Sequence, residues 1–385
     1  MNNDFIYLDS ASTTKPYNDI NYKYQHFDTP KIWMNPASLY ANDIKYIVDV
    51  CKKSIIEKLA EDESEYDFFF TSGATESNNW ILHNIILNNQ GRLSIPSIIV
   101  SPFEHPSVIN TLKYYEKKGM VRIIYLKTDC EGHIIISSLW DAIGDCSSPI
   151  LATCMWVNNE IGSIQPIKTL ANICKAYNIP FHVDATQAIG KIELNMLDGI
   201  SSISFSGHKF HGPKGIGGLL IKKDFLSQIK PFIIGGHQQN GYRAGTEDVE
   251  KIKMFFYSFI AANNHILNSI AHSEILKNYF EYKIKEKFND DDFIINSKDD
   301  TIPIINISFK NISGEYIVKE LAKKNIFIST GSACSTGDLS ISDTIKTIGV
   351  PEEYQEGTIR ISFDTDIGSN HIDTLIEELV EIFQN

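Results

Sequence analysis

Short runs of apolar residues recur between residues 67 and 206 of the chain. Runs this short and this apolar are typical of strands that are buried on both faces of a sheet. Helix-length stretches lie between most of them, for example at 75–88, 106–118 and 166–177. The predicted strands are DFFFT (67–71), SIIVS (97–101), VRIIYL (121–126), ILATCMWV (150–157), PFHVDA (180–185) and SSISFS (201–206).

This alternation predicts a mostly parallel sheet with helices on both faces. The next apolar run, GIGGLLIK at 215–222, follows SSISFS too closely for a crossover helix, so we expect it to be an antiparallel neighbour. In sheets of this kind ligands bind beyond the carboxyl ends of the strands. Candidate chemistry is therefore sought in the residues that follow each strand.

The pattern changes in the second half of the chain. Residues 247–289 have the pattern of helices with charged faces. Strands are predicted again at 302–309, 326–330 and 358–363, with helices at 314–324 and 371–384. This arrangement predicts a second, smaller α+β domain.

Composition narrows the class of protein. A chain of 385 residues with 43% hydrophobic and 22% charged residues is typical of a soluble globular protein of two or three domains. No apolar run approaches the roughly 18 residues of a membrane span, and the first residues lack a signal-peptide pattern. We therefore expect a protein without membrane contact that is cytoplasmic, with an organelle reached through a removed presequence as the alternative. The net charge of −13 argues against direct nucleic acid binding.

The six cysteines form no C-x-x-C pair and no zinc-like spacing, so no metal site is predicted. Cys154 and Cys174 have apolar neighbours and are expected to be buried fillers. Cys334 differs, because it lies in TGSACSTGD (330–338), a run of small and polar residues. It is either a surface cysteine without a role or a nucleophile to which an electrophile is brought.

Several strand ends carry polar residues. TSGATESNN (71–79) is a glycine turn that opens a helix, and it is either an anion site or only a helix cap. Asp184 and Gln187 follow PFHV, and an aspartate there needs a cationic or N–H partner. Lys209 follows SSISFSGH between glycines, although a solvated lysine is an equal alternative. Taken singly, His105 is a surface histidine and Asn159 a turn residue.

Taken together, these residues form a recognisable set: an anion cradle, an aspartate, a lysine, a histidine able to stack on a ring, and amide donors. Pyridoxal phosphate (PLP) requires such a set. Its lysine forms a Schiff base, and its aspartate keeps the pyridine nitrogen protonated so that the ring accepts electrons.

With these motifs the sequence resembles the cysteine desulfurases of the NifS/IscS type, which have the class V aminotransferase architecture of PLP fold type I. The resemblance covers nearly the whole chain, and HVDATQ followed by SGHK and GSAC is a highly specific combination. The matching stretches, in order, are YLDSAST, NPAS, FTSGATESNN, EHPSV, VNNEIGSIQPI, HVDATQAIGK, SFSGHKFHGPKGIGG, RAGTED, STGSACSTGDL and TIRISF.

The resemblance implies a cofactor site. Lys209 would form the Schiff base, Asp184 would bind the pyridine nitrogen, Gln187 would bind the phenolic oxygen and His105 would stack on the ring. Thr246 would reach the phosphate from the second subunit of a homodimer. The residues that would hold the phosphate within the subunit are Ala74, Thr75, Ser206 and His208.

The resemblance also implies the reaction. Asn159, Arg360 and Asn35 would hold the carboxylate of L-cysteine. Lys209, helped by His105, would move protons. Cys334 would take the substrate's sulfur as a persulfide, release L-alanine and pass the sulfur to an acceptor protein.

The family's organisation implies a large PLP-binding domain at 16–261. The small domain, at 1–15 and 262–385, would carry the cysteine loop.

The sequence departs from the family pattern in a few places. Ser10 and Ser12 replace common residues near the site, His237 replaces a glycine, and Ile341-Ser342 replaces Pro-Ser. The distance from Cys334 to Gly349 matches the long-loop group, which delivers persulfide to partner proteins. Because the sequence stops after the helix at 371–384, we hypothesise a tRNA- or DNA-thiolation acceptor over a general iron–sulfur scaffold.

Two alternatives compete with a cysteine desulfurase. A selenocysteine lyase or another class V PLP enzyme would use most of the same residues, although an aminotransferase has no use for Cys334. A sulfur carrier without enzymatic activity would not need both Lys209 and Asp184.

Overall fold

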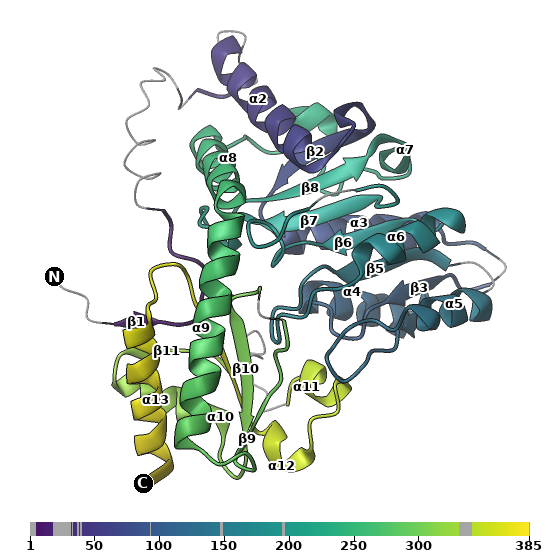
Figure 1. Ribbon diagram of the computed structural model, residues 1–385. Helices are drawn as coiled ribbons and strands as arrows, with labels where there is room; N and C mark the ends of the chain where they lie inside the picture. The colour runs from purple at the N-terminus through teal and green to yellow at the C-terminus, as the bar shows by residue number, and fades with distance from the viewer. Residues whose placement is uncertain are drawn as a thin grey trace.

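The computed structural model is built around a seven-stranded sheet between two layers of helices (Figure 1). The strand order is β2-β8-β7-β6-β5-β3-β4. Neighbours from β7 to β4 pair in parallel, and β8 runs antiparallel to β7, as the sequence predicts. Strand β8 also pairs antiparallel with β2, which the sequence did not predict. The strands are β2 (Tyr66–Thr71), β3 (Ser97–Val100), β4 (Arg122–Tyr125), β5 (Pro149–Met155), β6 (Phe181–Asp184), β7 (Ser202–Ser206) and β8 (Gly217–Lys222).

The sheet separates two hydrophobic cores, because successive side chains of a strand point to opposite faces. In β2, Phe68 and Phe70 belong to one core and Phe69 to the other. The first core is closed by α2 (Asn42–Leu59), α5 (Ile136–Asp145), α6 (Ile167–Ala176) and α8 (Val249–Asn264). The second is closed by α3 (Ala74–Asn88), α4 (Pro106–Lys117) and the short α7 (Lys223–Leu226).

A smaller antiparallel sheet with its own hydrophobic core lies beside the first sheet. Its strand order is β12-β10-β9, and helices from the second half of the chain pack against it. The strands are β9 (Phe293–Ile295), β10 (Ile304–Phe309) and β12 (Gly357–Ser362). The helices are α9 (Ile266–Lys287), α10 (Gly314–Lys323) and α13 (Ser369–Gln384). Two short helices, α11 (Asp343–Thr347) and α12 (Glu352–Gln355), precede β12 in the sequence.

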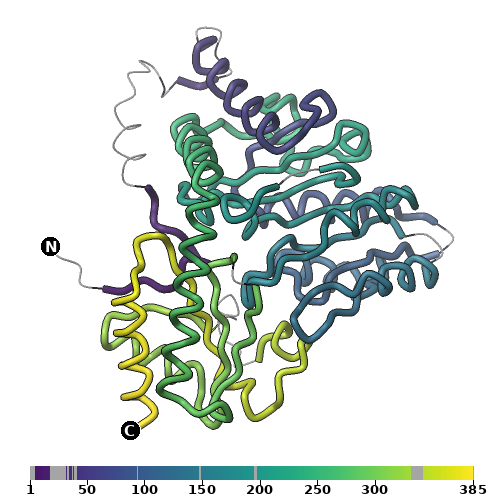
Figure 2. The backbone as a smooth tube through the Cα atoms, in the orientation of Figure 1, coloured from purple at the N-terminus to yellow at the C-terminus, as the bar shows by residue number. Residues whose placement is uncertain are grey.

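The N-terminal segment lies against this second part of the molecule (Figure 2). Strand β1 (Ile6–Tyr7) pairs in parallel with β11 (Ile326–Phe327), and Asp9 forms a β-bridge with Ser362. The division of the chain into domains at 15/16 and 261/262 stays a prediction, and residue 261 lies inside α8.

The structure describes most of the chain, and in that part no helix is long and apolar enough to cross a membrane. The described residues are 5–17, 32, 34–36, 38, 41–92, 94–146, 149–194, 197–299, 301–330 and 341–384.

Candidate active site

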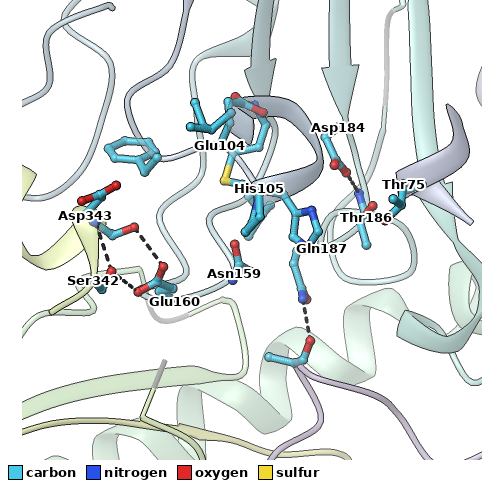
Figure 3. Close-up of a pocket in the computed structure, with 18 of the residues that line it drawn as sticks. Thr75, Glu104, His105, Asn159, Glu160, Asp184, Thr186, Gln187, Ser342 and Asp343 are labelled. Carbon is cyan, nitrogen blue, oxygen red and sulfur yellow. Dashed lines mark hydrogen bonds between the residues drawn. The ribbon is translucent and has the colours of Figure 1, made fainter. Parts of the chain in front are cut away.

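A pocket of about 500 Å³ opens at the carboxyl ends of the parallel strands (Figure 3). The first turns of α3 and α4 and the ends of β5, β6 and β7 form its walls, and Arg360 of β12 reaches it from the smaller sheet. The sequence places candidate chemistry at this edge. Ten predicted site residues line the pocket: Ala74, Thr75, His105, Asn159, Asp184, Gln187, Ser206, His208, Lys209 and Arg360.

Lys209 ends the short helix η2 (Gly207–Lys209) that follows β7. Its ammonium donates hydrogen bonds to the carbonyl oxygens of Ala11, at 2.7 Å, and Ser12, at 2.8 Å. Gly207 permits the tight turn, since an added Cβ would lie 2.9 Å from the ring of Phe255. The tip of Lys209 is therefore held in the pocket by the N-terminal segment.

The anion cradle at the start of α3 is present. Gly73 has φ of +155°, a conformation that favours glycine, and a Cβ there would lie 3.3 Å from Ser206 Oγ. Ser206 Oγ accepts a hydrogen bond of 2.8 Å from the backbone N–H of Ala74. Thr75 lies in the same first turn (Figure 3). The positive end of a 15-residue helix thus faces the pocket.

Asp184, at the end of β6, is 4% exposed. Its Oδ2 accepts a hydrogen bond from Asn78 Nδ2 at 2.8 Å, and its Oδ1 accepts one from the Thr186 N–H at 3.0 Å. The N–H partner that the sequence requires is therefore confirmed. Asn78 was not singled out, although it lies in the TSGATESNN motif.

Gln187 is held at both ends of its amide. Nε2 donates to the carbonyl oxygen of Ala11 at 2.8 Å, and Oε1 accepts from Lys191 Nζ at 2.9 Å. Because the carbonyl oxygen of Ala11 can only accept, it fixes which end of the amide is the donor. Burial, with the neighbouring charge of Lys209, lowers the pKa of Lys191 to about 7.

The two histidines of the pocket are held neutral. His105 caps α4, because its Nδ1 accepts the N–H of Ser107 at 3.1 Å. Burial lowers the pKa of His105; Asp184 opposes that shift and Lys209 adds to it. Burial and the nearby lysines lower the pKa of His208 to about 4.

Arg360 is 3% exposed, and residues of two different segments hold its guanidinium. Nη1 donates to the carbonyl oxygen of Asn159 at 2.9 Å. Nη2 donates to Asp9 Oδ1 and to Ser12 Oγ, both at 2.7 Å. Nε is buried and has no partner among the described residues. An arginine with an unused N–H beside a pocket is suited to a carboxylate ligand.

Sequence reasoning missed two carboxyl groups of this pocket, Glu104 and Glu160 (Figure 3). Burial and the nearby Asp184 raise the pKa of Glu104 to about 8. Burial also raises the pKa of Glu160, whose oxygens accept hydrogen bonds from the hydroxyls of Ser342, at 2.5 Å, and Thr344, at 3.2 Å. Glu104 directly precedes His105 and Glu160 directly follows Asn159 in the sequence. Their position beside predicted site residues was the signal that could have identified them.

Three predicted site residues are not among those that line the pocket. Asn35 and Thr246 are both exposed, and the predicted contact of Thr246 is with a second subunit. Cys334 lies outside the described residues. Of the other cysteines, Cys154 and Cys174 are buried, as predicted, and Cys130 is exposed.

The residues present fit PLP. The pocket volume is in the range of cofactor sites. A Cβ at Gly73 would fill the anion cradle, and the buried Asp184 presents a carboxylate to the same pocket as Lys209. The anion cradle suits the phosphate of PLP, Asp184 suits its pyridine nitrogen, and Lys209 suits its aldehyde.

Comparison with known proteins places the chain in a family. Residues 6–375 match the family model described as aminotransferase class-V. The chain therefore belongs to the class V aminotransferases, whose members use PLP. It is also 33% identical over 396 residues to a protein named cysteine desulfurase IscS from Clostridium botulinum (strain Kyoto), covering 99% of this chain and 95% of the relative. Within the class, the chain belongs to the IscS/NifS-like cysteine desulfurases.

Solved structures agree with this assignment. A structure titled NIFS-like protein has a TM-score of 0.87 and 28% identity, and the match covers 99% of both chains. A structure titled SspA in complex with cysteine has a TM-score of 0.76 and 28% identity, over 93% of this chain and 98% of SspA. The predicted fold class, PLP-dependent transferase fold type I, is confirmed.

Proposed function

We infer that this protein is a PLP-dependent cysteine desulfurase that converts L-cysteine to L-alanine and transfers the sulfur to its own Cys334. One observation carries the proposal: Lys209, Asp184 and the α3 anion cradle line a single pocket together with Arg360, a carboxylate-binding side chain. Membership of the IscS/NifS-like family and the cysteine bound to the related SspA support the choice of substrate.

The cofactor would be held by residues from four strand ends, those of β2, β3, β6 and β7. Lys209 would bind its aldehyde carbon, Asp184 its pyridine nitrogen and Gln187 its phenolic oxygen. His105 would lie against the ring. The phosphate would be bound by Ala74, Thr75, Ser206 and His208, and by Thr246 of a second subunit in a homodimer.

The substrate's carboxylate would be held by Arg360 and Asn159, with help from Asn35. Arg360 supports this role because its Nε–H is unused among the described residues and its guanidinium is anchored by Asn159 and Asp9. Anchoring reduces the conformational entropy that binding would otherwise cost. The pocket is thus preorganised for an α-amino acid.

When bound, PLP supplies an electron sink for the negative charge that develops at the substrate's Cα. Lys209 would take the proton from Cα, since its amine is held in the pocket by two backbone carbonyls. His105, neutral at the working pH, would assist this proton movement. The Cys334 thiolate would attack the substrate's sulfur, so that an S–S bond forms as the Cβ–S bond breaks, and protonation of Cβ gives alanine.

The persulfide on Cys334 would then pass to an acceptor protein. The chemistry suits acceptors in iron–sulfur cluster assembly, tRNA thiolation or DNA phosphorothioation, because all of them begin with the same persulfide. Given the net charge of −13, nucleic acid would be reached through that partner rather than by this chain.

The test is a measurement of alanine and sulfide released from L-cysteine by the purified protein with PLP and a reductant. The protein should be yellow and active, whereas Lys209→Ala should be colourless and inactive. A Lys209→Ala variant that turns over cysteine at the wild-type rate would refute the assignment. Activity with selenocysteine and none with cysteine would instead identify a selenocysteine lyase.

A further inference from the structure

One buried amide connects two of the residues proposed to contact the cofactor. Asn78, in the first turns of α3, is 0% exposed. Its Nδ2 donates to Asp184 Oδ2 at 2.8 Å and to Ser107 Oγ at 2.9 Å. Its Oδ1 accepts from His182 Nε2 at 2.9 Å and from Ser204 Oγ at 2.5 Å. Every donor and acceptor of this side chain is therefore used.

The chemistry of the partners defines the direction of these hydrogen bonds. The carboxylate of Asp184 can only accept, so the NH₂ end of Asn78 must face it. The oxygen end then faces His182, which must donate from Nε2 and accept at Nδ1 from the hydroxyl of Ser202, 2.8 Å away. Burial lowers the pKa of His182 to about 4, in agreement with a neutral ring.

The same direction continues to His105. Ser107 Oγ accepts from Asn78, so its own hydrogen is left for His105 Nδ1, at 2.8 Å. The backbone N–H of Ser107 donates to the same nitrogen at 3.1 Å. A proton on Nδ1 would oppose both donors. The ring of His105 must therefore carry its single proton on Nε2.

We propose that Asn78 is a positioning residue that, through Ser107, keeps His105 neutral with its proton on Nε2 while holding the carboxylate of Asp184. One side chain thus sets the hydrogen-bonding state of both groups. His105 offers an N–H to the pocket, and Asp184 offers an acceptor. The inference rests on the proposed function, in which both groups contact the cofactor.

The pocket that His105 lines holds other charged groups, of which Asp184 and Lys209 shift its pKa. These groups stay the same in the variants below, so a comparison of variants isolates the hydrogen bond. These groups are Glu104, Lys113, Glu160, Asp184, Lys209, Asp343 and Arg360.

The test is the pKa of His105 in Ser107→Ala. A hydrogen bond donated to Nδ1 stabilises the neutral ring, so removing the hydroxyl should raise this pKa by roughly half to one unit. The measurement is the pH dependence of ethoxycarbonylation by diethyl pyrocarbonate, which attacks neutral imidazole, followed on the His105 peptide by mass spectrometry. The acid limb of kcat/KM for cysteine should move upward with it.

Asn78→Ala should show the same upward shift, because the Ser107 hydroxyl is then free to turn and accept from Nδ1. Ser107→Thr keeps a hydroxyl and should titrate like the wild type. Thr111→Val is a matched control on the same helix: the single hydrogen of the Thr111 hydroxyl has two acceptors within reach, the Ser107 carbonyl oxygen and Asn79 Oδ1, and neither lies on the path to His105.

An unchanged His105 pKa in Ser107→Ala would overturn the proposal, and so would an equal shift in Thr111→Val. A shift in Ser107→Ala without one in Asn78→Ala would remove the role assigned to Asn78. The modification rate requires no turnover. A wild-type protein inactive on cysteine would therefore refute the proposed function and leave this comparison intact.

Discussion

Replacing Arg360 by lysine should raise KM for cysteine while leaving the colour of the bound cofactor intact. Lysine keeps the charge but loses the planar set of donors that a carboxylate matches. A hydrogen bond between charged groups is worth about 1.5–3 kcal/mol, so losing one of two bonds to the substrate should raise KM about 10- to 150-fold. Arg360→Lys should also lose stability, because Arg360 is 3% exposed and anchored at Asn159, Asp9 and Ser12.

The geometry of Arg360 allows a sharper version of this prediction. Every pair of adjacent N–H groups on a guanidinium that can face both oxygens of a carboxylate includes Nη2. Here Nη2 already donates to Asp9 Oδ1 and to Ser12 Oγ, and the Ser12 hydroxyl donates to the same Asp9 oxygen at 2.9 Å. A bidentate substrate must displace one of them, and the neutral hydroxyl of Ser12 is the weaker partner. Ser12→Ala should therefore lower KM, about twofold to tenfold for one hydrogen bond.

The assay for both variants is the steady-state rate of alanine formation against cysteine concentration, with the absorbance spectrum as the check on cofactor binding. The two substitutions should move KM in opposite directions. An unchanged KM in Arg360→Lys would show that another group holds the carboxylate. A raised KM in Ser12→Ala would show that Ser12 supports Arg360 instead of competing for it.

Three further predictions concern other parts of the site. Cys334→Ser should bind PLP and cysteine but transfer no sulfur, whereas Cys130→Ser, at an exposed thiol, should behave like the wild type; persulfide found by mass spectrometry on Cys130 alone would contradict this. Glu160→Gln keeps only one of the two oxygens that accept hydrogen bonds from the Ser342 and Thr344 hydroxyls, so it should destabilise the protein by about 1–3 kcal/mol; an unchanged melting temperature would contradict this. Lys191 has a pKa of about 7 in the folded protein, below that of an unfolded lysine, so above pH 7 the unfolded chain binds more protons than the folded one. The stability of the wild type relative to Lys191→Met should therefore rise above pH 7, by about 1.4 kcal/mol per pH unit at most. Melting temperatures of the two proteins that stay parallel from pH 7 to pH 9 would exclude this.

The main sheet could be predicted because its signals are local. Each parallel strand is a short apolar run, and burial on both faces makes such runs nearly continuous, as in FHVD of β6, where all four residues are buried. The antiparallel position of β8 followed from chain length alone, since too few residues separate it from β7 for a crossover. Ligand chemistry at the strand ends followed from the same topology, whereas Ala74, Ser206, His208 and Arg360 were predicted only from the family resemblance; all of these line the pocket.

The supporting residues of the site could not be predicted in this way. Asn78 bonds Asp184 across 106 positions, and Glu160 bonds Ser342 across 182. An asparagine in a helix and a glutamate in a loop look like solvated residues until the fold removes them from water. Helix α2 was also not predicted. Its buried positions, such as Ile44, Val48 and Ile55, recur at helical spacing but lie among charged and polar residues.

The N-terminal turn that holds Lys209 has a consequence for the order in which the protein is made. Its backbone is secured by β12: the N–H of Ser10 donates to the Ser362 carbonyl, and the N–H of Ala11 donates to Ser362 Oγ, 351 positions away. Ser362 also follows Lys209 by 153 residues, which at roughly 5–20 residues per second a ribosome needs about 8 to 30 seconds to add. A growing chain thus contains the lysine long before its support is in place. We expect cofactor uptake to follow the completion of β12, and ribosome-bound chains stalled ahead of that strand to remain colourless.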